Sequence, residues 1–372
     1  MKIFFPIAAF YPSQVGGPCN TVYWHTSALN KNNVLLRIVT TDHGIKDGEI
    51  PKNIELQNDS GSVIYFSKRK LPLKALKKIR VDIKWADIIH LNSLFSLFSI
   101  YSFFYIKLFH SNKKIVWSTR GETNPNALYF SSWKKKLILP FYKRLRDNII
   151  FHSTSDKETV DIRKVFPKSR IIQLPNYIQM APRISLPIQK QLIFVGRIHP
   201  IKGLHKLIKA ISLSETFKEA KFKLFIVGKV EDRNKFYINE LNELIKSLNL
   251  INSVEFKDHI SGYEKESLYA NSYALVLPSE TENFGNVVVE SLNQGTPVIA
   301  SLGTPWKELV DYKCGFHVSN DPHELAKSID EIISLSSDEY SEWRDNAKKL
   351  VDDNYNIDTQ IYKWIDFYKR NG

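Results

Sequence analysis

Short apolar runs alternate along the chain with longer segments in which apolar residues recur every three or four positions. The short runs have the length of buried strands, and the longer ones have the period of amphipathic helices. Strands that alternate with helices form a mainly parallel sheet covered by helices. The strands that we predict are residues 3–8, 34–40, 87–91, 114–118 and 149–152 in the first half, and 191–195, 223–227, 253–256, 273–277 and 297–300 in the second.

Five predicted strands in each half indicate an α/β protein with two doubly wound domains. Prolines at 175, 182 and 187 interrupt both helix and strand and suit a linker between them. We therefore place the first domain at residues 1–182 and the second at 183–353. Apolar residues at helical spacing in 354–372 predict a terminal helix that packs back on the body.

Charge is distributed unevenly along the 372 residues, which carry a formal net charge of +13. Residues 1–185 contain 29 Lys and Arg against 12 Asp and Glu, whereas the rest of the chain is slightly acidic. A basic first half indicates an anionic surface or polyanion as a partner of that half.

Neither cysteine content nor hydropathy places the protein outside the cell or across a membrane. The two cysteines, Cys19 and Cys314, form neither a disulfide framework nor a metal-ligand cluster, which favours a reducing compartment. The apolar stretch of residues 91–106 carries no charge, but it is interrupted by polar residues and is shorter than the roughly 20 residues of a spanning helix. We expect a cytoplasmic protein whose amino terminus is a buried strand.

One strand-to-helix junction carries an unusual set of residues. After the strand that ends at residue 277, Glu282 lies in a polar loop, Phe284 and Gly285 precede a helix, and Asn286 and Glu290 lie in it. The amino end of a helix favours an anion such as a diphosphate, and a glycine allows the backbone to approach it. Glu282 would accept hydrogen bonds from sugar hydroxyls and Glu290 from a ribose diol. By themselves, two glutamates at this spacing also fit an ordinary solvated helix.

A second junction supplies cations. A predicted strand ends at Gly196, and Arg197 and Lys202 flank a turn closed by Gly203. A planar guanidinium and a mobile ammonium at this spacing suit a clamp for two phosphates. Alone, they would also fit ordinary surface cations around a turn. Together with the junction of residues 282–290, they favour a diphosphate site.

These motifs, with Pro278-Ser279 and Gly295-x-Pro297-Val298-Ile299-Ala300, resemble the nucleotide-sugar-dependent glycosyltransferases of family 4. The resemblance implies the GT-B fold, in which two Rossmann-like domains face each other across a cleft. It also implies transfer of a sugar from a nucleotide diphosphate donor with retention of anomeric configuration, without a cofactor and usually without a metal ion. In this chain no Asp-x-Asp pair is present to bind Mg²⁺.

The first half matches the family less closely. Gly16 and Gly17 resemble its glycine loop, which would pass beneath the donor phosphates and the acceptor, although a Gly-Gly-Pro sequence is also an ordinary turn. His90 ends a predicted buried strand and is a candidate on the acceptor side, or else a core histidine. Arg120 stands where several family members have a histidine, and Glu122 is a candidate contact for an acceptor hydroxyl. Arginine does not shuttle protons at neutral pH, so Arg120 would bind a phosphate or orient a hydroxyl.

For catalysis we expect electrostatic stabilisation of the departing diphosphate by Arg197, Lys202 and the amides after Phe284. The resemblance further implies that the leaving phosphate oxygen takes the acceptor's proton on the same face. We expect a uridine diphosphate sugar as the donor first and guanosine diphosphate mannose second. The acceptor would be a lipid-linked sugar or a glycan of surface-polysaccharide or lipopolysaccharide assembly.

Two basic clusters of the first half, residues 68–84 and 134–146, are interleaved with apolar residues. Such segments fit a peripheral position on an anionic membrane, here the inner face of the cytoplasmic membrane, and also fit a solvated helix face. A nucleic-acid-binding protein is the alternative that the charge suggests, but the clusters show no recognisable binding module. Another GT-B enzyme, a nucleotide-sugar epimerase or a sugar phosphorylase, would share the phosphate site.

Overall fold

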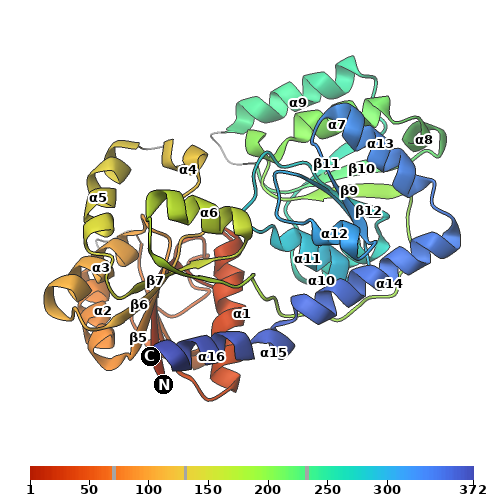
Figure 1. Ribbon diagram of the computed structural model, residues 1–372. Helices are drawn as coiled ribbons and strands as arrows, with labels where there is room; N and C mark the ends of the chain where they lie inside the picture. The colour runs from red at the N-terminus through yellow and green to blue at the C-terminus, as the bar shows by residue number, and fades with distance from the viewer. Residues whose placement is uncertain (69–72, 130–131, 231–233) are drawn as a thin grey trace. The chain divides into compact units, whose positions relative to one another are not determined.

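The computed structural model describes residues 1–68, 73–129, 132–230 and 234–372, which form two units (Figure 1). The N-terminal unit consists of Met1–Gln179 together with Ile357–Gly372, and the C-terminal unit is Met180–Asn356. The sequence predicts a boundary after residue 182 and a terminal helix that packs back on the body. In the structure the division follows Gln179, and the last residues of the chain are part of the N-terminal unit.

The N-terminal unit is built on a sheet whose strands are β1 Lys2–Ala9, β2 Leu35–Thr41, β3 Glu55–Asn58, β4 Gly61–Phe66, β5 Ile88–Asn92, β6 Lys114–Ser118, β7 Ile149–Ser153 and β8 Arg170–Gln173. Their order across the sheet is β3-β4-β2-β1-β5-β6-β7-β8. Neighbouring strands are parallel except β3, which runs antiparallel to β4. The carboxyl ends of the central strands β1, β5, β6 and β7 therefore meet at one edge.

Helices cover both faces of this sheet. They are α1 Gly17–Lys31, α2 Leu73–Trp85, α3 Leu97–Phe109, α4 Pro125–Tyr129, α5 Ser132–Arg144, α6 Asp156–Val165, α15 Ile357–Gln360 and α16 Tyr362–Asn371. Two hydrophobic cores result. One lies under α2, α3, α5 and α6, and the other lies under α1, α15 and α16.

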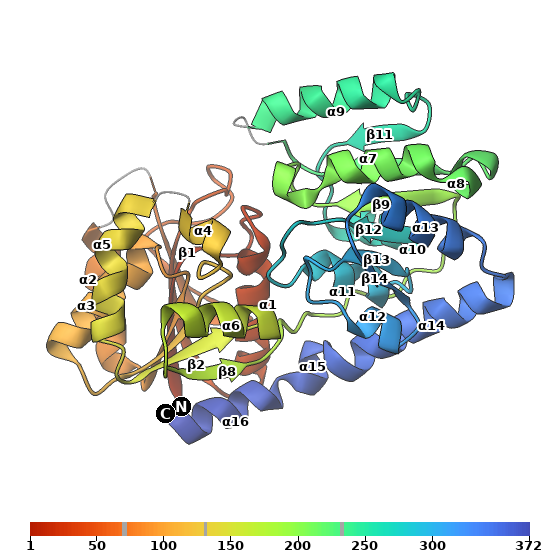
Figure 2. The ribbon, with the colours of Figure 1, turned by 45° about the horizontal axis from the view of Figure 1, so that its top comes forward.

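The final helices, α15 and α16, belong to the N-terminal unit. Their apolar residues recur with helical spacing, so they form one apolar face that packs on this unit. Ile357, Ile361, Trp364 and Tyr368 are all buried, and they pack in the same core as α1. As a result, α16 brings the carboxyl terminus beside the amino terminus of the chain (Figure 2).

The C-terminal unit has a six-stranded, wholly parallel sheet in the order β11-β10-β9-β12-β13-β14. Its strands are β9 Gln191–Val195, β10 Lys223–Val227, β11 Val254–Lys257, β12 Ala274–Leu277, β13 Val298–Ser301 and β14 Gly315–Val318. Its helices are the 3₁₀ helix η1 Pro200–Lys202, α7 Leu204–Leu213, α8 Glu215–Glu219, α9 Lys235–Ser247, α10 Gly262–Asn271, α11 Asn286–Asn293, α12 Glu308–Asp311, α13 Pro322–Ile333 and α14 Ser337–Asn354.

All ten predicted strands are present to within a residue or two at their ends, and four more complete the sheets: β3, β4, β8 and β14. These four lie at or next to sheet edges. Edge strands are only partly buried, so their apolar pattern is weak. β8, for example, has no buried residue.

Candidate active site

An ion pair connects two loops at the carboxyl ends of β9 and β12 in the C-terminal unit. Lys202 at the end of η1 and Glu282 in the loop after β12 join through Nζ and Oε2, with only 14% and 18% of their side chains exposed. The backbone reinforces this contact, because the Glu280 amide donates to the Ile201 carbonyl at 2.8 Å. Two of the predicted site residues, far apart in sequence, are therefore adjacent in the structure.

Gly203 allows these loops to come together. Its backbone is left-handed, with φ +68°, and a Cβ on it would overlap the carbonyl oxygen of Pro278. Only glycine avoids both penalties at this position. The turn after η1 is therefore fixed against the start of the β12 loop, and Lys202 is held next to Glu282.

The β12 loop then leads into α11 through Gly285, which precedes the helix with φ +83°. Phe284 is buried, and its carbonyl accepts from the Trp306 indole nitrogen at 2.6 Å. The Glu282 amide donates to the Gly303 carbonyl at 3.0 Å. The loop is thus anchored on both sides of the helix start, where backbone amides from Asn286 onward and the helix dipole favour an anion.

Glu290 lies in the second turn of α11, where both of its carboxylate oxygens have partners. Oε1 is 3.1 Å from the Lys265 ammonium, and Oε2 accepts from the Tyr269 hydroxyl at 3.0 Å. The residue is only 8% exposed. A ribose diol would have to share these oxygens or displace Lys265. The sequence gives no sign that Glu290 has these two partners.

Arg197 is exposed after β9, between the strand and η1. Gly196 precedes it at a close approach of two backbones: the Gly196 amide donates to the Val227 carbonyl at 3.0 Å, and a Cβ on Gly228 would overlap the Gly196 carbonyl. Gly228 is a structural requirement that the sequence motifs do not reveal, since it belongs to the following strand end.

In the N-terminal unit, Gly16 and Gly17 form the start of α1. Gly16 is the residue before the helix and has extended backbone, and Gly17 is its first residue. A Cβ on Gly16 would meet only the Pro18 ring at 3.6 Å, an ordinary contact. The structure therefore shows no packing reason for glycine at position 16.

His90 is the third residue of β5, and its ring belongs to a buried hydrogen-bond chain. The Leu174 carbonyl can only accept, so His152 donates to it through Nε2 at 2.8 Å and accepts at Nδ1 from the Ser118 hydroxyl at 2.7 Å. Ser118 in turn accepts from His90 Nε2 at 2.7 Å. A neutral histidine donates through one ring nitrogen and accepts through the other, so the donor of each hydrogen bond follows from the bond before it.

The chain continues onto the last helix of the protein. His90 Nδ1 accepts from the Tyr368 hydroxyl at 2.6 Å, and that oxygen accepts from His25 Nε2 at 3.0 Å. Burial lowers the pKa of His25 and of His152 to about 3 and lowers that of His90 well below its ordinary value, which keeps all three neutral. Both ring nitrogens of His90 are thus engaged inside the unit, and the acceptor contact stays a prediction.

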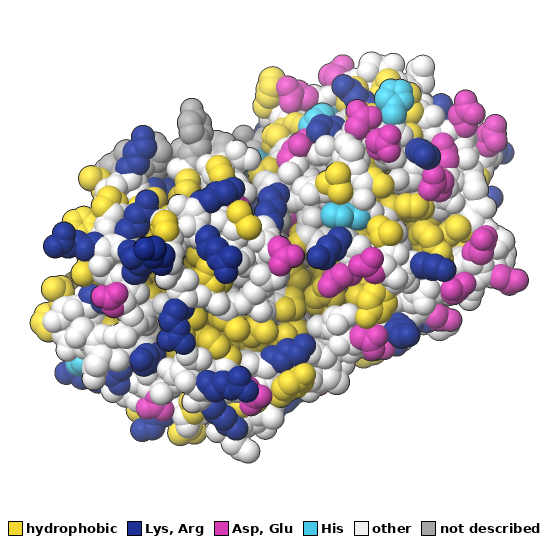
Figure 3. Space-filling view, viewed as in Figure 1, with side chains coloured by type: hydrophobic (Ala, Val, Ile, Leu, Met, Phe, Trp, Pro, Cys, Tyr) yellow, Lys and Arg dark blue, Asp and Glu magenta, His cyan; other side chains and the backbone are white. Residues whose placement is uncertain are grey.

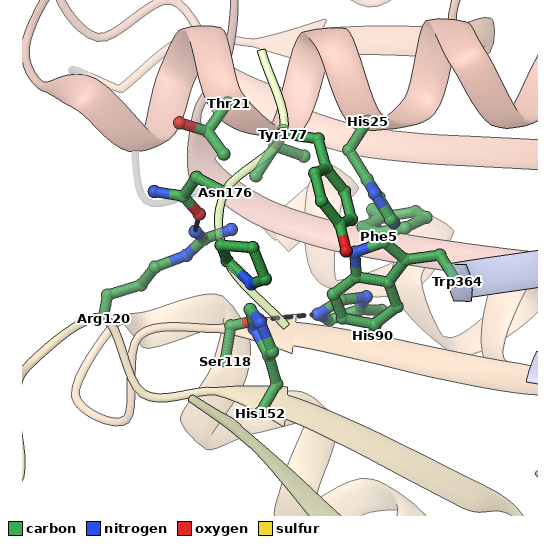
Figure 4. A pocket seen from close by; sticks show the side chains of 12 residues that line it. Phe5, Thr21, His25, His90, Ser118, Arg120, His152, Asn176, Tyr177 and Trp364 are labelled. Carbon is green, nitrogen blue, oxygen red and sulfur yellow. Dashed lines mark hydrogen bonds between the residues drawn. The ribbon is translucent and has the colours of Figure 1, made fainter. Parts of the chain in front are cut away.

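Arg120 follows β6 and has left-handed backbone, with φ +54°. Its guanidinium donates through Nε and Nη2 to Asn92 Oδ1, at 3.1 and 2.7 Å, and through Nη1 to Asn176 Oδ1 at 3.2 Å. Burial lowers the pKa of Arg120 to about 10, so the group stays charged at neutral pH. The side chain lines a small pocket with His25, His90 and other residues of the same unit (Figure 4).

Glu122 has a structural role. Its Oε1 accepts from the Ser93 hydroxyl at 2.7 Å, and its Oε2 accepts from the backbone amides of Leu94 and Phe95. Burial raises the pKa of this carboxyl group, and these hydrogen bonds oppose that shift. Both oxygens hold the loop after β5, and a contact with an acceptor hydroxyl stays a prediction.

Several residues of the pocket escape sequence reasoning. His25, His152, Asn176, Tyr177 and Trp364 line it together with the predicted Arg120 and His90. They come from α1, β7, the segment after β8 and α16, and none lies in a motif. The sequence offers one signal for such pocket residues: a polar residue inside an otherwise apolar strand or helix, such as His152.

Comparison with known proteins defines the class of this fold. The chain superposes on an Anabaena protein, HepE, in complex with UDP and glucose (TM-score 0.74, 19% identity, 98% of this chain and 99% of the other). It also superposes on WaaG, described as a glycosyltransferase involved in lipopolysaccharide biosynthesis (TM-score 0.69, 16% identity, 98% and 99% coverage). The predicted GT-B fold, with two Rossmann-like domains, is thereby confirmed.

The sequence comparisons are more specific. Residues 184–350 match the family described as "Glycosyl transferases group 1". An uncharacterised glycosyltransferase of Methanocaldococcus jannaschii is 28% identical over 249 residues, which are 65% of this chain and 62% of that protein. Residues 184–350 are therefore similar to group 1 glycosyltransferases, which supports the predicted enzyme class, and the chain spans about three fifths of the length of that relative.

Among the described residues, no helix is long and apolar enough to cross a membrane. Nor does the described part of the chain contain a group of three or more His, Cys, Asp or Glu side chains that could hold a metal ion.

Proposed function

We propose that this protein is a retaining glycosyltransferase of family 4. It moves a sugar from a nucleoside diphosphate donor, a uridine diphosphate sugar first and guanosine diphosphate mannose second, to an acceptor hydroxyl. The observation that carries the proposal is the ion pair of Lys202 and Glu282 beside the amino end of α11. The similarity of residues 184–350 to group 1 glycosyltransferases and the resemblance to a fold that binds UDP and glucose in HepE support it.

The charges around the loops of the C-terminal unit suit the leaving group. When the bond from the anomeric carbon to the phosphate breaks, positive charge develops on the sugar and negative charge on the diphosphate. Arg197, Lys202 and the first amides of α11 stabilise the diphosphate, and Lys202 is already held in place by Glu282 before the reaction begins. Glu282 holds the Lys202 ammonium and accepts from sugar hydroxyls with its other oxygen.

In this proposal the leaving diphosphate takes the proton of the acceptor hydroxyl on the face from which it departs. The new bond then forms on that same face, which retains the anomeric configuration without a protein nucleophile. The anomeric configuration of the isolated product, determined by NMR coupling constants, tests this step. An inverted product contradicts it.

Nucleotide binding provides the direct test of the site. Isothermal titration of the protein with UDP, GDP and ADP should show one nucleoside diphosphate bound, and Lys202→Met should weaken that binding by tenfold or more. A matched control is Lys209→Met, since Lys209 is an exposed lysine of α7 in the same unit. Equal affinities of the wild type and Lys202→Met would contradict the site, and binding of none of the nucleotides would contradict the function.

The acceptor, we propose, is a lipid-linked sugar or glycan of surface-polysaccharide or lipopolysaccharide assembly, reached from the inner face of the cytoplasmic membrane. Support comes from α2, α3 and α5, which pack side by side: Arg80 lies over the Tyr101 ring at 5.7 Å, and the Phe104 and Phe141 rings are 5.9 Å apart. Basic side chains gather on the N-terminal unit (Figure 3). Exposed on these helices are the basic Lys74, Lys77, Arg80, Lys84, Lys136, Lys143 and Arg144 and the apolar Leu73, Val81, Leu97, Leu108, Phe109, Leu137 and Phe141.

Cations beside exposed apolar side chains suit an anionic bilayer, where each cation near the headgroups contributes about 1 kcal/mol. Arg69 and Lys70 of the first predicted cluster lie outside the described residues. Sedimentation with vesicles that contain phosphatidylglycerol should capture the wild type but not a Lys77→Glu, Lys143→Glu variant. The control with equal charge change, Lys209→Glu, Lys349→Glu, should still sediment. Loss of binding in both variants, or no binding of the wild type to these vesicles, would contradict the membrane proposal.

A further inference from the structure

The pocket of the N-terminal unit lies near the carboxyl ends of β5, β6 and β7, next to the loops that follow these strands. Trp364 and the histidine rings form its inner wall, and Arg120, Asn176 and Tyr177 surround the rest (Figure 4). Loops at this edge of a parallel sheet are the usual place for a ligand.

The positive charge in this pocket has no carboxylate in contact. Within the described part of the chain, Arg120 bonds only to the neutral amides of Asn92 and Asn176. Glu158 is the nearby carboxylate, but its oxygens accept from the hydroxyl groups of Thr119 and Thr154 and from backbone amides. A largely enclosed charge without an ion-pair partner is costly unless a ligand supplies the opposite charge.

The arginine is also held in place. Residue 120 has left-handed backbone, the adjacent Gly121 amide donates to Glu158 at 2.7 Å, and two side-chain amides hold the guanidinium fork. The guanidinium points between α1 and the segment of residues 175–177 (Figure 4). A planar cation fixed in this way is suited to a carboxylate or a phosphate.

Two buried donors nearby have no hydrogen-bond partner among the residues that the structure describes. The Tyr177 residue is 3% exposed, lines the pocket, and has a hydroxyl without a partner. The Asn92 residue, also 3% exposed, uses its oxygen for Arg120 and leaves its amide nitrogen unpaired. Buried polar groups are normally satisfied, and each orphan costs free energy. Both are donors, which is what an anion requires.

The histidines do not accept from these two donors. His25, His90 and His152 are neutral, and the hydrogen-bond chain through Ser118 and Tyr368 uses every ring nitrogen except His25 Nδ1. Among the described residues, Nδ1 bonds to neither the Tyr177 hydroxyl nor the Asn92 amide. The pocket thus combines one fixed positive charge with unpaired donors.

We propose that this pocket binds an anionic group of the substrate, a carboxylate or a phosphate, through Arg120 and the Tyr177 hydroxyl. Asn92 and Asn176 are positioning residues for the guanidinium. The substrate is therefore a sugar acid or a phosphorylated compound. This class of substrate rests on the proposed glycosyl transfer. Anion binding in the pocket does not depend on that proposal.

The test measures the melting temperature of the full chain against increasing sodium glucuronate and sodium phosphate at constant ionic strength, with glucose as the neutral probe. Bound ligand raises the melting temperature by mass action, which gives an apparent Kd. We expect saturable binding of at least one anion, weakened tenfold or more in Arg120→Gln and several-fold in Tyr177→Phe. Arg120→Lys keeps the charge and should bind better than Arg120→Gln.

Two variants, Arg120→Gln and Lys202→Met, distinguish anion binding in this pocket from anion binding at the donor site. Lys202→Met should leave pocket binding unchanged, while any phosphate bound beside α11 is lost in Lys202→Met and kept in Arg120→Gln. Tighter binding of glucuronate identifies a carboxylated sugar, and tighter binding of phosphate identifies a phosphorylated substrate. Equal affinities of the wild type and Arg120→Gln, or no saturable binding of either anion by the wild type, overturns the proposal. Neither result bears on nucleotide binding, which tests the function separately.

Discussion

The Tyr368 hydroxyl lies 2.6 Å from His90 Nδ1 and thereby joins the last helix of the chain to the central strand β5. The same oxygen accepts from His25 at 3.0 Å. One hydroxyl therefore satisfies two buried rings and ties α16 to the N-terminal unit. The C-terminal residues belong to this unit through a polar contact as well as through apolar packing.

Replacement of this hydroxyl should be costly. Tyr368→Phe leaves His90 and His25 each with an unpaired buried nitrogen, and at about 1–3 kcal/mol for each orphan group we expect a loss of about 2–6 kcal/mol of stability. Urea unfolding measures the change. Tyr362→Phe is the control, since Tyr362 is on the same helix and 53% exposed. A loss no greater than that of the control would show that the hydrogen bonds are not needed.

The buried histidines predict a particular pH dependence. Their folded pKa of about 3 lies below the ordinary value of 6.5, so the unfolded chain binds protons that the folded chain does not. Their contribution to stability is complete above pH 6.5 and is lost as the pH falls from there toward 3, at about 1.4 kcal/mol per pH unit for each histidine. His152→Gln should flatten this decline relative to the wild type, whereas the exposed His323→Gln should not. Identical slopes in all three proteins would contradict the buried, neutral state.

The fit of Gly203 against Pro278 predicts a strong effect of a single methyl group. Gly203→Ala adds a Cβ that overlaps a carbonyl oxygen, in addition to the strain of positive φ. The control Gly262→Ala has a similar positive φ and nothing within 4 Å, so it carries the strain alone, about 1 kcal/mol. We expect Gly203→Ala to lose more stability than the control and to weaken nucleotide binding. Equal effects of the two variants would mean that the loop adjusts without cost.

The contact between Lys202 and Glu282 predicts that their effects are coupled. Glu282→Gln and Lys202→Met each disturb the same pair, so the double variant should lose less transfer activity than the sum of the two single losses, by about 1–3 kcal/mol in transition-state free energy. Initial rates of the four proteins measure the cycle. Additive losses would indicate that the two side chains act independently.

The unpaired Tyr177 hydroxyl predicts a gain in stability on its removal. Tyr177→Phe eliminates a buried donor without a partner and should leave stability unchanged or raise it by about 1 kcal/mol. The control is Tyr142→Phe, because the buried Tyr142 hydroxyl donates to the Leu94 carbonyl at 2.8 Å and its loss should destabilise the protein. A large destabilisation by Tyr177→Phe would show that the hydroxyl has a structural partner.

The central strands of both sheets could be predicted from the sequence because they are buried on both faces and read as continuous apolar runs. The edge strand β8 could not, since its residues Arg170–Gln173 are only partly covered. The motifs after β9 and β12 were recognisable for a different reason: glycines and charged residues at fixed spacing after a strand have few structural explanations.

By itself, the sequence determined two α/β domains, the motifs after β9 and β12, and the residues Lys202 and Glu282 as candidates, because strand length, helix period and turn glycines are local properties. Tertiary structure decided which of the candidates meet. It engaged Glu122 and His90 in internal hydrogen bonds and left Arg120 without a carboxylate. Hydrogen-bond partners depend on side chains brought together from distant strands and helices, and no local pattern records those distances.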